Sequence, residues 1–127
     1  MHLQLENLHK SYLDGEGRTL HILRGVDLRL EQPGQTAAIV GASGTGKSTL
    51  LHLIGLLDQP DQGRVLLDDK DLSLLSRDAQ ARYRNTQLGF IFQFHQLLQD
   101  FSALENVMMP ALVQGPVSYT HLTLPTT

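Results

Sequence analysis

One stretch of this sequence decides the fold: Gly41-Ala42-Ser43-Gly44-Thr45-Gly46-Lys47-Ser48. It has the spacing G-x-x-x-x-G-K-[ST], in which glycines let the backbone wrap closely enough for its N–H groups to face phosphate oxygens. A short apolar run, residues 36–40, precedes the stretch, and an apolar segment suited to a buried helix, residues 48–54, follows it. This order of strand, glycine-rich loop and helix predicts a nucleotide-binding P-loop.

The residue types of the loop match the chemistry of a bound nucleotide. We expect Lys47 to reach the β- and γ-phosphates, and the hydroxyl of Ser48 to be a ligand of Mg²⁺, a hard cation that prefers oxygen. The alternative is a glycine-rich turn that precedes a lysine by chance. Such a coincidence is rare, because four positions of the motif are specified. The residues predicted to contact the nucleotide are Gly41, Ala42, Ser43, Gly44, Thr45, Gly46, Lys47, Ser48 and Thr49.

Hydrophobic periodicity on both sides of the loop predicts an α/β chain. Apolar residues alternate with polar ones before the loop, whereas residues 36–40 and 88–92 show no such alternation, as in strands covered on both faces. Ser102 and Glu105 form a capping box at the start of a later helix, in which Pro110 would cause a kink. The predicted strands are 3–8, 20–30, 36–40, 64–67 and 88–92, and the predicted helices are 48–54, 76–87 and 102–112.

Composition excludes several classes of protein. The 127 residues include no Cys, which excludes zinc ribbons, disulfide scaffolds and thiol catalysis. The 10 Lys and Arg against 13 Asp and Glu argue against a basic surface, so no nucleic-acid partner is expected. No apolar run approaches the ~20 residues of a membrane span, and no export signal is visible at the start, so we expect a cytosolic location.

Two other classes of P-loop protein fit the sequence less well. A GTPase would have Asp-x-x-Gly and Asn-Lys-x-Asp after the loop, and neither string occurs there, although the second could lie beyond residue 127. Small-molecule kinases of this class usually place the loop after the first strand, whereas here about forty residues precede it.

The order of three motifs resembles that in the ATP-binding subunits of ABC transporters. Tyr12 is similar to the family's A-loop aromatic, residues 41–49 to its Walker A motif, and Gln93 to its Q-loop. The stretches 88–98 and 101–110 look most like the lipoprotein-releasing (Lol) branch, and Phe94-His95 after Gln93 favours that branch. The resemblance implies a P-loop NTPase (RecA-like) core with an N-terminal antiparallel β subdomain.

The resemblance also implies roles for two residues outside the loop. Tyr12 would stack on adenine, although a lone aromatic near a strand end could equally be a packing residue. Gln93 would contact Mg²⁺ and the attacking water and sense the membrane partner, although it could be an ordinary surface residue. The implied catalytic residues are Lys47 and Gln93, and the implied metal ligands are Ser48 and Gln93.

At the level of function, the resemblance implies ATP hydrolysis that drives release of lipoproteins from the bacterial inner membrane. A macrolide-type or other efflux transporter of the same branch is the alternative. The implied partners are transmembrane permease subunits, near whose coupling helix the helix 102–112 would dock, and a second copy of the ATPase, with two nucleotides sandwiched between the copies. The implied location is the cytoplasmic face of the inner membrane.

The later motifs of the family are not found in this sequence. It contains no Leu-Ser-Gly-Gly-Gln signature, no apolar run ending in Asp-Glu after Gln93 and no later switch histidine, so we expect an N-terminal part of the domain, residues 1–116, without turnover. Residues 117–126 resemble a sequencing-library transposase adapter translated in one frame, so residues 117–127 are interpreted as non-native. Different synonymous codons in the DNA would contradict that interpretation.

Overall fold

The computed structural model describes residues 2–114, and the interpreted tail 117–127 lies outside this range. The chain divides into two compact units, Met1–Gln80 and a second one that begins at Ala81. Each unit is described by itself.

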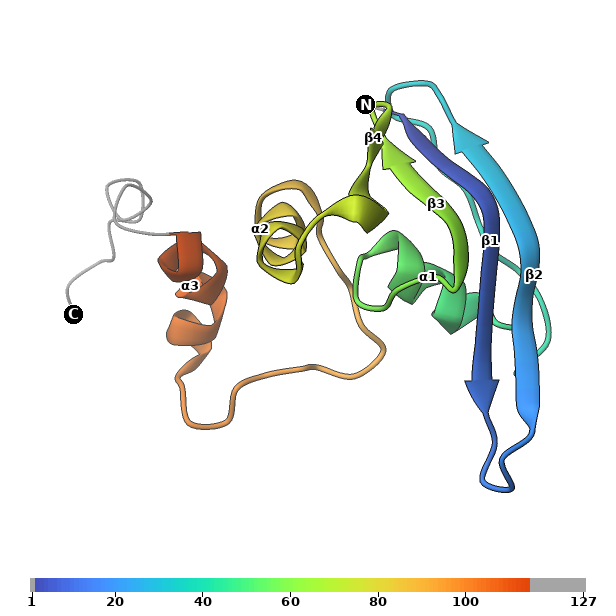
Figure 1. The fold of residues 1–127 in the computed structure, drawn as a ribbon. Helices are drawn as coiled ribbons and strands as arrows, with labels where there is room; N and C mark the ends of the chain where they lie inside the picture. Colours follow the sequence, from blue (N-terminus) through green and yellow to red (C-terminus); the bar gives the residue numbers. More distant parts are fainter. Residues whose placement is uncertain (1, 115–127) are drawn as a thin grey trace, which may run out of the picture. The chain divides into compact units, whose positions relative to one another are not determined.

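The first unit is built on an antiparallel sheet (Figure 1). Strand β1 lies inside the sheet because it pairs with β2 on one edge, from Leu3↔Leu30 to Leu13↔Thr19, and with β3 on the other. A turn at residues 14–18 joins the first two strands. The strands are β1 (Leu3–Leu13), β2 (Thr19–Leu30), β3 (Gln62–Leu67) and β4 (Lys70–Asp71), in the order β2-β1-β3-β4.

Helix α1 (Lys47–Ile54) packs on the sheet and contributes Leu50 and Leu53 to the core of this unit. Leu53 of α1 is fully buried, and so is Leu8 of β1. The helix ends at Gly55, close to the end predicted from the sequence. The buried core cluster consists of Leu5, Leu8, Leu23, Leu50, Leu53 and Val65. The glycine-rich loop is therefore connected directly to the element that packs on the sheet.

The buried side-chain amide of Gln80 holds the segment after β4 in place. A short 3-10 helix, η1 (Leu72–Leu74), leads into α2 (Arg77–Gln87), which crosses the boundary between the two units. Gln80 is 3% exposed, donates a hydrogen bond to the Leu72 carbonyl at 3.0 Å, and accepts one from Gln59 at 2.9 Å. This pair of bonds holds the chain that follows α1 against the start of α2.

The second unit contains α3 (Ala103–Gln114), and its predicted capping box is confirmed. The Glu105 N–H donates to the Ser102 hydroxyl at 3.1 Å, and the Ser102 N–H donates to the Glu105 carboxylate at 3.0 Å. Pro110 lies inside the helix. No residue of α3 is buried, and Val107 on its apolar face is 79% exposed. None of the helices in the described part of the chain has the length and apolar character needed to cross a membrane.

The prediction of strands at residues 36–40 and 88–92 is wrong. Neither segment forms a strand, and within residues 2–114 neither has a pairing partner. Val40 is 87% exposed and Ile91 is fully exposed. An apolar run forms a strand only where a neighbouring strand pairs with its backbone N–H and C=O groups. Without such a partner, these groups must find their hydrogen bonds in water, so the run stays irregular and exposed.

Candidate functional site

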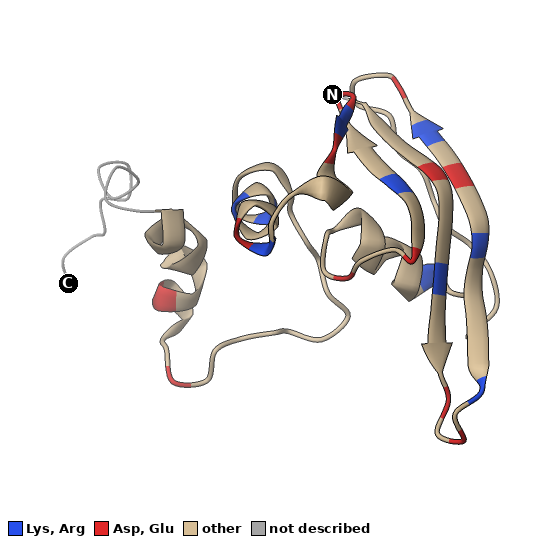
Figure 2. Ribbon diagram, viewed as in Figure 1, with Lys and Arg blue, Asp and Glu red and all other residues tan. Residues whose placement is uncertain are grey.

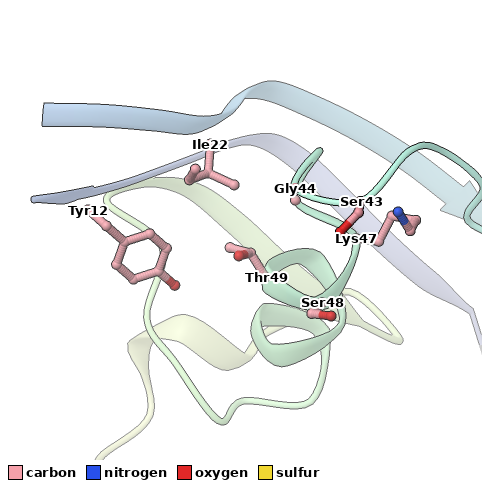
Figure 3. Close-up of a pocket in the computed structure, with 8 residues that line it drawn as sticks. Tyr12, Ile22, Ser43, Gly44, Lys47, Ser48 and Thr49 are labelled. Carbon is pink, nitrogen blue, oxygen red and sulfur yellow. The ribbon is translucent and has the colours of Figure 1, made fainter. Parts of the chain in front are cut away.

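The first unit has a pocket of about 470 Å³ around the glycine-rich loop. Residues from β1, β2, the loop and the first turn of α1 contribute to it (Figure 3). Its lining consists of Tyr12, Ile22, Ser43, Gly44, Gly46, Lys47, Ser48 and Thr49. The predicted nucleotide residues thus lie together with the predicted aromatic residue, although Tyr12 is separated from the loop by about thirty residues of sequence.

Gly46 sets how closely the loop approaches the sheet. Its backbone has φ of 99°, a left-handed conformation that side chains disfavour. A Cβ atom at this position would lie 2.7 Å from Cγ2 of Ile22 on β2. Only glycine therefore allows both the turn into α1 and this contact with the hairpin.

The N-terminus of α1 is open toward the pocket. Gly46 is the N-cap residue, and no side chain within residues 2–114 caps the helix. The first N–H groups of a helix have no partner inside the helix, and together with the helix dipole they attract anions. The geometry is therefore that of a phosphate site.

Lys47 is folded back onto the loop. Its ammonium group donates to the carbonyl oxygen of Gly41 at 2.7 Å and to that of Ala42 at 2.6 Å. The Ala42 carbonyl also accepts a bond from the Thr45 hydroxyl at 2.7 Å. These bonds hold the loop in a closed turn and keep a positive charge at its centre. The next residue, Ser48, is exposed in the first turn of α1.

Tyr12 borders the pocket on the side opposite Ser43 and Gly44 of the loop (Figure 3), and its hydroxyl group is hydrogen-bonded outside the pocket. It donates a hydrogen bond to Oδ2 of Asp58 at 2.8 Å. Burial and the bond to the Asp58 carboxylate raise the pKa of Tyr12, against smaller opposite effects of Thr49 and Lys10. Burial acts to raise the pKa of Asp58, but hydrogen bonds from Tyr12, the Gln59 N–H and Lys10 outweigh it and lower that pKa. The phenol is therefore a donor and the carboxylate an acceptor at neutral pH.

Gln93 belongs to the second unit and is not part of the pocket lining. It lies at a bend of an irregular, exposed segment that runs through residues 91–100. Its implied contact with Mg²⁺ and water stays a prediction. Of the two implied metal ligands, Ser48 belongs to the first unit and Gln93 to the second.

Sequence reasoning missed three residues of this site. Ile22 lines the pocket from β2, while Asp58 and Lys10 hold Tyr12 from outside it. The sequence contains no signal for the bond between Tyr12 and Asp58, because 46 residues separate them and they belong to no common motif.

Comparison with known proteins identifies the relatives of this chain. Residues 23–123 match the family described as ABC transporter. The chain is 56% identical over 113 residues to the lipoprotein-releasing system ATP-binding protein LolD of Shewanella frigidimarina (strain NCIMB 400), covering 89% of this chain and 46% of that protein. It is 51% identical over 112 residues to the LolD protein of Nitratidesulfovibrio vulgaris (strain Hildenborough), covering 88% and 47%. The chain thus spans about half the length of the curated relatives it matches.

Solved structures give the same family. The dimeric structure of MJ0796, described as a bacterial ABC transporter cassette, matches with a TM-score of 0.82 and 36% identity over 90% of this chain and 48% of that chain. A post-hydrolysis state of the same cassette, bound to ADP and phosphate, matches with a TM-score of 0.80 and 36% identity over 89% and 48%.

Proposed function

The chain belongs to the ABC transporter family, and we propose that its pocket binds ATP together with Mg²⁺ as part of the ATP-binding subunit of a lipoprotein-releasing system. The observation that carries the proposal is the open N-terminus of α1 beside Lys47 and across from Tyr12. Relatives named LolD, at more than 50% identity, support the lipoprotein-releasing branch over the efflux alternative.

The phosphates would be held by the loop and the start of α1. Helix N–H groups donate to phosphate oxygens, and the left-handed Gly46 turns the chain so that these groups face the pocket. Lys47 would exchange the carbonyl oxygens of Gly41 and Ala42 for phosphate oxygens. A phosphate oxygen carries negative charge whereas a carbonyl oxygen is neutral, so the added Coulomb attraction to the ammonium group favours this exchange.

The residues present also fit the cation. Ser48 offers an exposed hydroxyl oxygen in the first turn of α1, next to Lys47, which would contact the phosphates. Mg²⁺ is bound in such sites by few protein oxygens plus phosphate oxygens and water. When bound, it neutralises phosphate charge. The family resemblance implies the same kind of role for Gln93, which would be a further ligand and would orient the attacking water.

Tyr12 would contribute the site for the base. Its ring borders the pocket on the side away from Ser43 and Gly44 (Figure 3). Stacking of a base on an aromatic side chain contributes about 1 to 3 kcal/mol and needs only a correctly oriented ring. The position of Tyr12 supports adenine stacking over a packing role, because the ring is 39% exposed on a pocket rather than enclosed in the core.

For the whole protein we propose ATP hydrolysis that drives extraction of lipoproteins from the inner membrane. Its partners would be transmembrane permease subunits and a second copy of the ATPase, and its location the cytoplasmic face of that membrane. The uncovered apolar face of α3 supports docking near a membrane subunit. The 127-residue chain would bind nucleotide without turnover, because it contains the Walker A motif but not the signature, Walker B or switch histidine.

Calorimetric titration of the chain with ATP in the presence of Mg²⁺ tests nucleotide binding. Lys47→Ala removes a charged donor, for which a loss of about 1.5 to 3 kcal/mol is typical, so we expect affinity to fall at least tenfold. The matched control, Lys70→Ala, removes the same charge from β4 and should bind like the parent chain. Equal affinity of parent and Lys47→Ala would contradict the proposed site, and turnover that Lys47→Ala abolishes would contradict the proposed inactivity of this chain.

A further inference from the structure

Among residues 2–114, the part of β1 that carries Tyr12 has only one neighbouring strand. Pairing of β1 with β3 ends at His9↔Gln62, whereas pairing with β2 continues to Leu13↔Thr19. The other edge of this part of β1 is covered by the turn after α1: the Ser11 N–H donates to Oδ2 of Asp61 at 2.7 Å. The Asp61 N–H in turn donates to the His9 carbonyl at 2.8 Å. This turn therefore takes the place of a second neighbouring strand along the part of β1 that carries Tyr12.

A lysine with little exposure fixes the turn to β1. The Lys10 side chain is 12% exposed, and its ammonium group donates to the Gln59 carbonyl at 2.8 Å and to Oδ1 of Asp58 at 3.2 Å. The same ammonium group lies 5.2 Å from the centre of the Tyr12 ring. The Gln59 N–H adds a bond of 2.8 Å to Oδ1 of Asp58, so the carboxylate is held in one orientation.

The second oxygen of that carboxylate accepts the bond from Tyr12. Oδ1 of Asp58 is bound by Lys10 and the Gln59 N–H, and Oδ2 receives the Tyr12 hydroxyl at 2.8 Å. Tyr12 is 39% exposed, and its side chain could otherwise rotate about two χ angles. The bond at the far end of the ring removes this freedom and leaves the ring bordering the pocket.

From this geometry we propose that Asp58 is a positioning residue: with Lys10, it holds the Tyr12 ring in the orientation that stacks on the base of a nucleoside triphosphate. The proposal rests on the proposed function, since it concerns the base half of the same pocket. Asp58 does not line the pocket, so its effect reaches the ligand only through Tyr12. It should therefore alter binding of the base and leave binding of the phosphates unchanged.

The experiment compares two ligands, Mg²⁺–ATP and Mg²⁺–tripolyphosphate, by calorimetry on the 127-residue chain. Tripolyphosphate has the phosphate chain but no base. Tyr12→Phe removes the donor of the bond and Asp58→Ala removes its acceptor, and each should weaken ATP binding about fivefold, as expected for loss of roughly 1 kcal/mol of orientation. Neither should change tripolyphosphate binding. The double variant should lose no more ATP affinity than the single variant with the larger loss, because both substitutions remove the same bond.

The control, Glu31→Gln, removes the same charge from an exposed pair with Arg29 and should bind both ligands like the parent chain. Equal losses for both ligands, additive losses in the double variant, or no loss at all would overturn the positioning role. If Asp58→Ala does not fold, Tyr12→Phe against the parent still tests the ligand dependence. A parent chain that binds both ligands equally well overturns this inference alone, whereas one that binds neither overturns the proposed function with it.

Discussion

The antiparallel strands of the first unit and the segment 88–92 of the second unit contain similar apolar residues but differ in structure. Strand β1 is paired on both edges, and Leu5 on it is 1% exposed. In the other segment Ile91 is fully exposed, and the rings of Phe90 and Phe92 stack on each other with their centroids 5.5 Å apart. Figure 2 shows few charged residues from the end of α2 to the end of α3, where residues 88–114 include only Asp100 and Glu105.

The difference teaches that apolar sequence alone does not make a strand. A short turn brings β2 beside β1, so their hydrogen bonds form between neighbours in sequence. Parallel strands need a crossover of a dozen residues or more before a partner is available. Residues 36–40 and 88–92 would need partners of that kind, and within residues 2–114 none is paired with them.

The largest expected effect is that of Gly63→Ala in the paired region. Gly63 has φ of 93°, and a Cβ atom there would lie 2.3 Å from the Asn7 carbonyl oxygen on β1. Because backbone cannot move aside as a side chain can, we expect a loss of at least about 4 kcal/mol of unfolding free energy. Urea denaturation followed by circular dichroism measures it.

The matched control for that substitution lies in the unpaired region. Gly89 has open space around its Cβ position, so Gly89→Ala should change the unfolding free energy by less than about 0.5 kcal/mol. A large loss for Gly89→Ala would show that residues 88–92 are packed after all, and would remove the contrast between the two regions.

A second, smaller effect is expected from truncating buried and exposed aliphatic side chains. Leu53 of α1 is fully buried, so Leu53→Ala should cost about 3 kcal/mol through lost burial and the cavity that remains. Ile91→Ala removes a fully exposed side chain and should cost close to nothing. The same urea titrations give both values. Similar losses for the two variants would contradict the described difference in packing.

The smallest expected effect is a loss of stability at acidic pH, and it involves one carboxyl group in each unit. The pKa values of Asp58 and Glu105 are lowered, the latter by its bonds with the Ser102 N–H and hydroxyl. A lowered pKa means that the stabilising contribution is present above the ordinary value, 3.8 for Asp58 and 4.5 for Glu105, and is lost as the pH falls through the lowered one.

NMR titration of two amide protons checks this effect site by site. The Gln59 N–H reports on Asp58 and the Ser102 N–H reports on Glu105, because each donates to the respective carboxylate. Both titration midpoints should lie below the ordinary pKa values, and Asp58→Asn should abolish only the first. A midpoint at or above the ordinary value would show that the bond does not persist in solution.

Local signals in the sequence were sufficient for part of the fold and site. The spacing of the P-loop predicted a helix from residue 48, and α1 begins at Lys47. Ser102 and Glu105 predicted the cap of α3, because both partners lie within one turn. In contrast, the bonds of Asp58 to Lys10 and Tyr12 join residues that are 48 and 46 positions apart, respectively. Such bonds depend on how β1 ends beside the turn after α1, which no local pattern encodes.

The folded-back position of Lys47 has a consequence for ligand selectivity. The carbonyl oxygens of Gly41 and Ala42 act as an internal competitor, since any anion must displace them to reach the ammonium group. A singly charged ion such as chloride offers too little in return, whereas a polyphosphate offers several oxygens at once. The loop should therefore discriminate against the common anions of the cell and respond mainly to ligands of high charge.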